Sequence, residues 1–175
     1  MTTRRRAREV VLQVLYEDDM NPTRDRTLSK QFIENRMLRN KPLIAFGEEL
    51  LEGVRTRRNE IDSLVGQYAA NWSVKRMSTI DRNVIRLATY EMVFGKVPGR
   101  VVINEAIELA KRYGHVNSGS FVNGILDKIL RETSKKDSGS KTESTSIEST
   151  PTPSSQAVTD SLEPDQAEST TPSIA

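Results

Sequence analysis

Apolar residues recur three or four positions apart along most of residues 3–131, and this spacing limits the possible folds more than any other feature of the sequence. An amphipathic helix places such residues on one face, whereas a half-buried strand alternates apolar and polar residues. No segment shows sustained alternation bounded by turn residues. The sequence therefore predicts an all-α domain, a helical bundle of six or seven helices with short connections.

The first predicted helix, over residues 3–17, has two apolar faces. Its main stripe recurs at i, i+3, i+4, i+7 and i+8 and consists of Ala7, Val10, Val11, Val14 and Leu15. At about 100° per residue, Leu12 and Tyr16 share a second face. Two interpretations of this second face stay open: another helix of the same protein covers it, or a partner protein binds there. Thr2 or Thr3 is the expected N-cap.

The segment that follows is expected to contain two or three helices. Residues 28–37 predict a short helix of weak periodicity. After Pro42 the spacing indicates either one long helix or two helices broken near Arg58 or Asn59. Trp72 follows them and is expected to fill the core rather than to stack on a ligand.

The last three predicted helices include the central one. Residues 77–94 carry apolar side chains around most of the helix circumference, which indicates a buried, central helix. The next helix, around residues 103–113, ends at Gly114. The last helix begins with Asn117 or Ser118 as its cap and continues to about residue 130.

From residue 134 onward the composition changes abruptly. Of the 42 residues in 134–175, 22 are Ser, Thr or Pro, and seven acids against three lysines give a net charge of −4. The preceding residues hold 23 basic and 17 acidic side chains, a net charge of +6. Apolar residues in the tail are too few and too far apart to repay the entropy of ordering it. The expected domains are therefore a basic folded domain at 1–133 and a disordered, acidic tail at 134–175.

The sequence gives little indication of a catalytic site or a metal site. It has no cysteine and only one histidine, His115, which excludes thiolate sites and histidine clusters. Glycine-rich phosphate loops and nucleophile motifs are also missing. We therefore expect no catalytic residue, no metal and no cofactor, and binding as the function. No apolar run is long enough to span a bilayer, so a soluble, cytoplasmic protein is expected.

The strongest electrostatic feature is a group of four arginines within five residues, at the start of the first helix: Arg4, Arg5, Arg6 and Arg8. Guanidinium groups offer paired donors that suit phosphates, and they stay charged at all physiological pH values. Nucleic acid is one ligand that fits this charge. An acidic protein partner and an ordinary solvated surface are the other two interpretations.

Three sequence blocks carry a family resemblance. They are RRAREVVLQVLY (residues 5–16), MSTIDRNVIRLATYE (residues 77–91) and the pair VINEAIELAK (residues 102–111) and FVNGILDK (residues 121–128). In this order they resemble the bacterial NusB family of transcription antitermination factors. A similar fold occurs as the N-terminal domain of some ribosomal RNA cytosine methyltransferases, but we expect no methyltransferase domain here.

The resemblance implies an all-α fold of two small helical subdomains without catalytic activity. It also implies binding to boxA RNA together with NusE, a small-subunit ribosomal protein. The complex would join the RNA polymerase elongation complex with other Nus factors, chiefly during ribosomal RNA synthesis. Homodimers occur in the family. A purely protein-binding or homodimeric helical module without RNA recognition is the alternative function.

The resemblance also assigns residues. The four arginines would bind RNA, with a second RNA contact at the start of the last helix: Asn117, Ser118, Ser120 and Phe121. The NusE-binding surface would consist of Leu12, Tyr16, Arg76, Asp81 and Arg82, which explains the second apolar face of the first helix. Two of these residues could instead have a structural role: Phe121 is suited to packing in the core, and Asp81 is suited to stabilising a helix N-terminus.

Overall fold

A computed structural model of the chain describes residues 3–69, 73–95 and 97–139. These residues form seven α-helices and one short 3-10 turn, and they contain no strand. The elements are α1 (Arg4–Met20), α2 (Leu28–Arg36), α3 (Lys41–Thr56), α4 (Arg58–Tyr68), η1 (Val74–Arg76), α5 (Thr79–Val93), α6 (Gly99–Tyr113) and α7 (Ser118–Gly139). The all-α prediction is therefore confirmed, and Trp72 lies outside the described residues.

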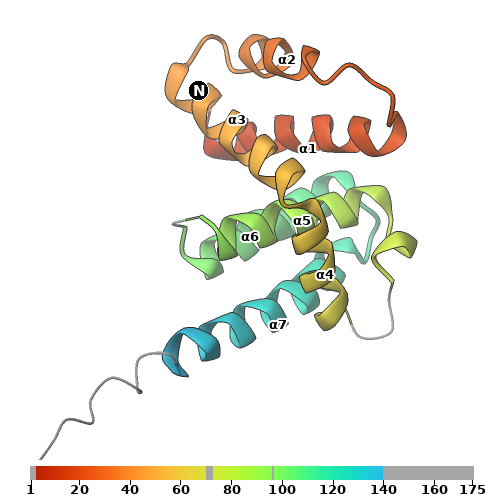
Figure 1. The fold of residues 1–175 in the computed structure, drawn as a ribbon, viewed down its shortest axis with the longest axis vertical. Helices are drawn as coiled ribbons and strands as arrows, with labels where there is room; N and C mark the ends of the chain where they lie inside the picture. The colour runs from red at the N-terminus through yellow and green to blue at the C-terminus, as the bar shows by residue number, and fades with distance from the viewer. Residues whose placement is uncertain (1–2, 70–72, 96, 140–175) are drawn as a thin grey trace, which may run out of the picture. The chain divides into compact units, whose positions relative to one another are not determined.

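The helices pack as two groups that share α5. Helices α1, α2 and α3 contact one another, and α4, α5, α6 and α7 form the second group. Both α1 and α3 also contact α5, which packs against α4, α6 and α7 as well (Figure 1). The even distribution of apolar residues around α5 follows from this central position, as its sequence predicted.

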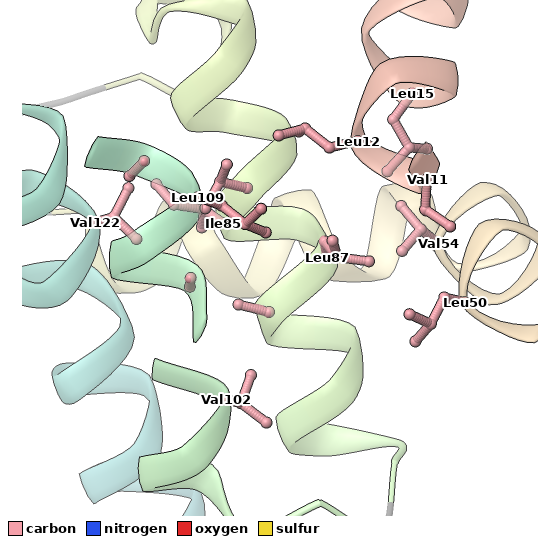
Figure 2. Packing of buried hydrophobic residues seen from close by; sticks show 14 of the residues in the cluster. Val11, Leu12, Leu15, Leu50, Val54, Ile85, Leu87, Val102, Leu109 and Val122 are labelled. Carbon is pink, nitrogen blue, oxygen red and sulfur yellow. The ribbon is translucent and has the colours of Figure 1, made fainter. Parts of the chain in front are cut away.

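The hydrophobic core runs through both groups. Figure 2 shows labelled side chains from α1, α3, α5, α6 and α7, with Ile85 and Leu87 of α5 between the others. Ile85, Leu87 and Leu126 are almost fully buried, and each such side chain contributes about 1.5–3 kcal/mol to stability. Gly53 lets α3 approach α5, because a Cβ atom there would lie 2.0 Å from Cζ of Tyr90.

Local capping explains several helix boundaries. The Thr3 hydroxyl accepts a hydrogen bond from the Arg6 N–H, so the predicted N-cap of α1 is confirmed. Between α3 and α4 the chain breaks at Arg57, one residue before the expected position. Gly114 follows α6 as expected, but with a φ of −94° rather than in a left-handed conformation. Close contact with the Ser118 side chain is what requires glycine there.

The boundary expected at residue 134 is wrong for the first part of the tail. Helix α7 continues to Gly139. The Thr133 hydroxyl donates to the carbonyl oxygen of Ile129, and the Ser134 hydroxyl donates to that of Leu130, in each case four residues earlier. These side chains therefore bond to the backbone of the helix without interrupting it. Residues 140–175 lie outside the described part of the chain. Among the helices described, none combines the length and apolarity that crossing a bilayer requires.

Candidate functional site

The four arginines lie in the first turns of α1, but their side chains have different surroundings. Arg4 lies over the Phe46 ring, with 5.1 Å between the guanidinium carbon and the ring centroid. Arg5 donates two hydrogen bonds, of 2.9 and 2.8 Å, to the Glu105 carboxylate of α6. These two arginines and the half-buried Arg6 face solvent, so they form one cationic surface, here named the α1 patch.

Arg8 does not belong to this patch. Its Nε and Nη2 atoms each donate a 2.7 Å hydrogen bond to the Glu91 carboxylate of α5. The Arg8 side chain is only 6% exposed and that of Glu91 only 2%. The main apolar stripe of α1 carries Arg8 toward α5, and a buried guanidinium requires a buried carboxylate partner. Arg8 therefore has a structural position, and the expectation that it contacts RNA is corrected.

Two acidic residues hold the α1 patch in place. The Glu105 carboxylate accepts from Arg5, and this hydrogen bond, together with the nearby charges of Arg5 and Arg8, holds the pKa of Glu105 below its usual value despite partial burial. The Glu9 carboxylate accepts from Arg6 at 2.9 Å and from Arg112 of α6 at 2.8 Å. Sequence reasoning missed Glu105, Glu9 and Arg112 as partners, and only the Arg6–Glu9 spacing signalled a pair.

The second predicted RNA contact, at the start of α7, contains both exposed and buried residues. Asn117 and Ser120 are exposed, and the Ser120 hydroxyl donates to the Asn117 carbonyl oxygen at 2.9 Å. Ser118 is buried, and its hydroxyl accepts from the His115 N–H at 2.8 Å. Phe121 is half-buried and packs against the core. Ser118 therefore shapes the turn before α7, and the other three residues remain accessible.

The second apolar face of α1 is only partly covered. Leu12 is buried and extends from α1 toward α5 (Figure 2), whereas Tyr16 is 37% exposed. Tyr16 lines a mainly apolar groove of about 450 Å³, and Leu12 forms part of its base. The remaining lining residues are Glu9, Gln13, Glu17, Phe32, Arg36, Ile80 and Tyr113. The protein therefore covers Leu12 itself and leaves Tyr16 open to solvent.

The other predicted partner-binding residues, on η1 and at the start of α5, differ in how exposed they are. Asp81 is largely buried, and its Oδ1 atom has no hydrogen-bond partner among the described residues. Its position in the first turn also suits the helix dipole. Arg76 is exposed on η1. Arg82 is mostly buried and donates from Nε and Nη2 to Asp19, which leaves it little freedom to contact a partner.

Asp19, at the end of α1, is the centre of a cluster that sequence reasoning missed. Its carboxylate accepts from Arg58 of α4 and from Arg82 and Arg86 of α5. Burial alone would raise the pKa of Asp19, but the Arg82 hydrogen bond and the charges of Arg86 and Arg58 outweigh it and lower that pKa. Arg86 also donates twice to Asp62 at 2.7 Å. This network ties α1, α4 and α5 together.

The arrangement as a whole is suited to binding. Cationic groups at the start of α1, polar groups at the start of α7 and the Tyr16 groove lie on stable helices. Within residues 3–69, 73–95 and 97–139, no group of three or more acidic or histidine side chains is placed to hold a metal ion.

Comparison with known proteins agrees with this geometry. The pattern that defines the NusB family matches residues 5–131. The chain is 45% identical over 137 residues to the transcription antitermination protein NusB of Desulfitobacterium hafniense, covering 77% of this chain and 93% of that protein. It is 40% identical over 131 residues to the Bdellovibrio bacteriovorus NusB, covering 74% and 96% of the two chains.

Solved structures show the same similarity. T. maritima NusB aligns with a TM-score of 0.68 and 40% identity, over 78% of this chain and 98% of that one. A chain in the crystal structure of antitermination factors NusB and NusE in complex with dsRNA aligns with a TM-score of 0.66 and 30% identity, over 74% and 96%. The family pattern, the relatives and the fold agree, and the chain belongs to the NusB family.

Proposed function

We propose that this protein is a cytoplasmic transcription antitermination factor that binds boxA RNA together with NusE. The complex joins RNA polymerase elongation complexes with other Nus factors, chiefly during ribosomal RNA synthesis. The observation that carries the proposal is the match of residues 5–131 to the NusB family, whose members include named antitermination proteins. Its role is binding rather than catalysis.

The proposed RNA surface is the α1 patch with Asn117, Ser120 and Phe121. Acidic partners orient Arg5 and Arg6 while leaving them accessible, so an approaching phosphate meets guanidinium groups already in position. Charge-assisted bonds from arginine to phosphate are stronger than neutral hydrogen bonds. The ring of Phe121 and the exposed polar groups before it are suited to an unpaired base.

The proposed NusE surface is the groove beside Tyr16. An aromatic side chain with a hydroxyl group buries area and fixes orientation, which is typical of an interface anchor. Ile80 lines the same groove, and the next residue, Asp81, holds a buried carboxylate oxygen for which the described residues provide no donor. A basic group on the partner would be attracted to that carboxylate.

Salt-dependent RNA titration tests the proposal. Fluorescence anisotropy would measure the affinity for boxA RNA at several salt concentrations, with and without NusE. The double variant Arg5→Ala with Arg6→Ala removes two phosphate contacts, and because each contact on a single strand contributes about 0.7 to the slope of log K against log salt, the slope should flatten by about 1.4. Addition of NusE should tighten RNA binding.

A matched control removes two exposed cations from another part of α7, Lys128→Ala with Arg131→Ala, and it should leave the slope unchanged. Equal slopes and affinities for the Arg5/Arg6 variant and wild type would contradict the RNA surface. A wild-type protein that binds NusE but no RNA, with or without the partner, would support the protein-binding module instead.

A further inference from the structure

A buried carboxylate holds two arginines from different helices at one point on the surface. Glu9 of α1, with a side chain only 5% exposed, accepts from Arg6 and from Arg112 of α6. One carboxylate balances one of the two guanidinium charges. The three residues therefore carry one net positive charge, which is fixed in place instead of being spread over flexible side chains.

Arg112 is held on one edge and open on the other. Its Nη1 atom donates to Glu9, and its guanidinium carbon lies 5.5 Å from the centroid of the Tyr113 ring. Arg112 makes no other hydrogen bond to a described residue, and its side chain is 63% exposed. A guanidinium has five N–H donors, so most of them face solvent in a fixed orientation. This is the geometry that two-point recognition of a phosphate requires.

The neighbouring residue, Lys111, lies toward α7 and pairs with the Glu108 carboxylate at 3.5 Å, and its side chain is 63% exposed. Its side chain passes over Gly119, so closely that a Cβ atom on that glycine would lie 3.1 Å from Cγ of Lys111. A hollow of about 200 Å³ separates α1 from the last turns of α6. Its lining residues are Arg5, Glu9, Glu108, Leu109, Lys111 and Arg112.

The hollow lies between the two surfaces proposed to bind RNA. Arg5 of the α1 patch lines it on one side, and Lys111 on the other side packs against the first turn of α7, which carries Ser120. An RNA strand that contacts both surfaces has to cross the end of α6. Its backbone would leave a phosphate beside Arg112, because phosphates follow one another at every nucleotide.

We propose that Arg112 and Lys111, with Arg6 and Glu9, form a phosphate-binding site for the RNA backbone. This site joins the α1 patch and the start of α7 into one continuous RNA-binding surface. Glu9 is a positioning residue, since it orients both guanidinium groups and is itself buried. The inference rests on the proposed function and adds a site of defined ligand chemistry, one RNA phosphodiester group.

The variant Arg112→Ala tests this site, because Arg6 still pairs with Glu9 and the fold is retained. Loss of one phosphate contact should flatten the slope of log K against log salt by about 0.7, which weakens binding of boxA RNA about fivefold at 0.1 M salt. Lys111→Ala leaves the Glu9 pairs intact and should change the slope by a similar amount. Arg131→Ala, an exposed arginine with an acid four residues earlier, is the matched control and should bind like wild type.

Other outcomes separate this site from the function on which it rests. Wild-type RNA binding with unchanged slopes for both Arg112→Ala and Lys111→Ala would overturn the site alone. Absence of RNA binding by the wild-type protein would overturn the proposed function and the site together. Inorganic phosphate that binds wild type and Arg131→Ala but not Arg112→Ala, without displacing RNA, would show a free-anion site instead of a backbone site.

Discussion

Arg8→Ala is the substitution that best separates a structural arginine from an RNA-binding one. Two 2.7 Å hydrogen bonds join its guanidinium to Glu91, and both side chains are almost completely buried between α1 and α5. Phe46 lies against the same guanidinium at 5.4 Å. Truncation to alanine would leave the Glu91 carboxylate buried, charged and without its partner.

The expected cost can be worked out in two ways. Removal of one member of a buried ion pair destabilises proteins by about 3–5 kcal/mol. Two charge-assisted hydrogen bonds at about 1.5–3 kcal/mol each give a similar range. Because a domain of this size is stable by about 5–15 kcal/mol, a loss of about 3–5 kcal/mol in Arg8→Ala would remove at least about a fifth of that free energy. RNA binding by the molecules that remain folded should keep its salt slope.

Urea denaturation followed by circular dichroism would measure this loss, and RNA titration at several salt concentrations would measure the slope. Arg6→Ala is the matched control on the same helix, with an expected cost below about 1 kcal/mol, because Arg6 is partly exposed and Glu9 keeps its bond from Arg112. The double variant Arg8→Met with Glu91→Leu removes both charges and should recover most of the lost stability.

One outcome would contradict the structural role of Arg8. If Arg8→Ala unfolds at the wild-type urea concentration and flattens the salt slope by about 0.7, Arg8 contacts phosphate and its buried pairing with Glu91 does not occur in solution.

Two further predictions concern α1. Tyr16→Ala should weaken NusE binding by about 2 kcal/mol in calorimetric titration. Because Tyr16 is partly exposed, the same variant should lose less stability than the roughly 3–5 kcal/mol that truncation of a buried aromatic side chain costs. Normal NusE affinity would exclude Tyr16 as the anchor. Asp19 has a lowered pKa in the folded state, so its contribution to stability is present above the unfolded value of about 3.9 and is lost as the pH falls through the folded value. Urea melts between pH 7 and pH 2 should therefore show that Asp19→Asn is less stable at pH 7 and loses less stability on acidification; parallel curves for the variant and wild type would contradict this.

The helices could be predicted from the sequence because apolar spacing alone decides which face of a helix is buried. The central position of α5 followed from its even apolar distribution, and the break near Arg57 followed from the polar residues between two apolar stripes. The spacing of apolar residues predicts secondary structure less well in segments rich in Ser and Thr. Ser and Thr composition suggested disorder from residue 134, yet α7 continues to Gly139, and the Ser134 hydroxyl donates to the Leu130 carbonyl oxygen within it.

The charged partners could not be predicted, because they come from distant parts of the chain. Arg8 and Glu91 are separated by 83 positions, and Glu9 and Arg112 by 103. The sequence groups Arg5 and Arg8 in one cationic cluster, and only the neighbouring helices show which of them is buried. For the same reason Arg82 looked available to a partner, whereas in the fold it is bonded to Asp19.

Helix α1 carries parts of both proposed binding surfaces, Arg5 near its first turn and Tyr16 near its last. These residues are eleven positions apart, which corresponds to about 16 Å along a helix that rises about 1.5 Å per residue. The buried Arg8 pair and the Asp19 cluster fasten both ends of this helix to α5. A helix fastened at both ends in this way holds the two surfaces at a fixed spacing. Cooperation between RNA and NusE on this protein would then arise from contact between the two ligands themselves, held side by side at a fixed spacing.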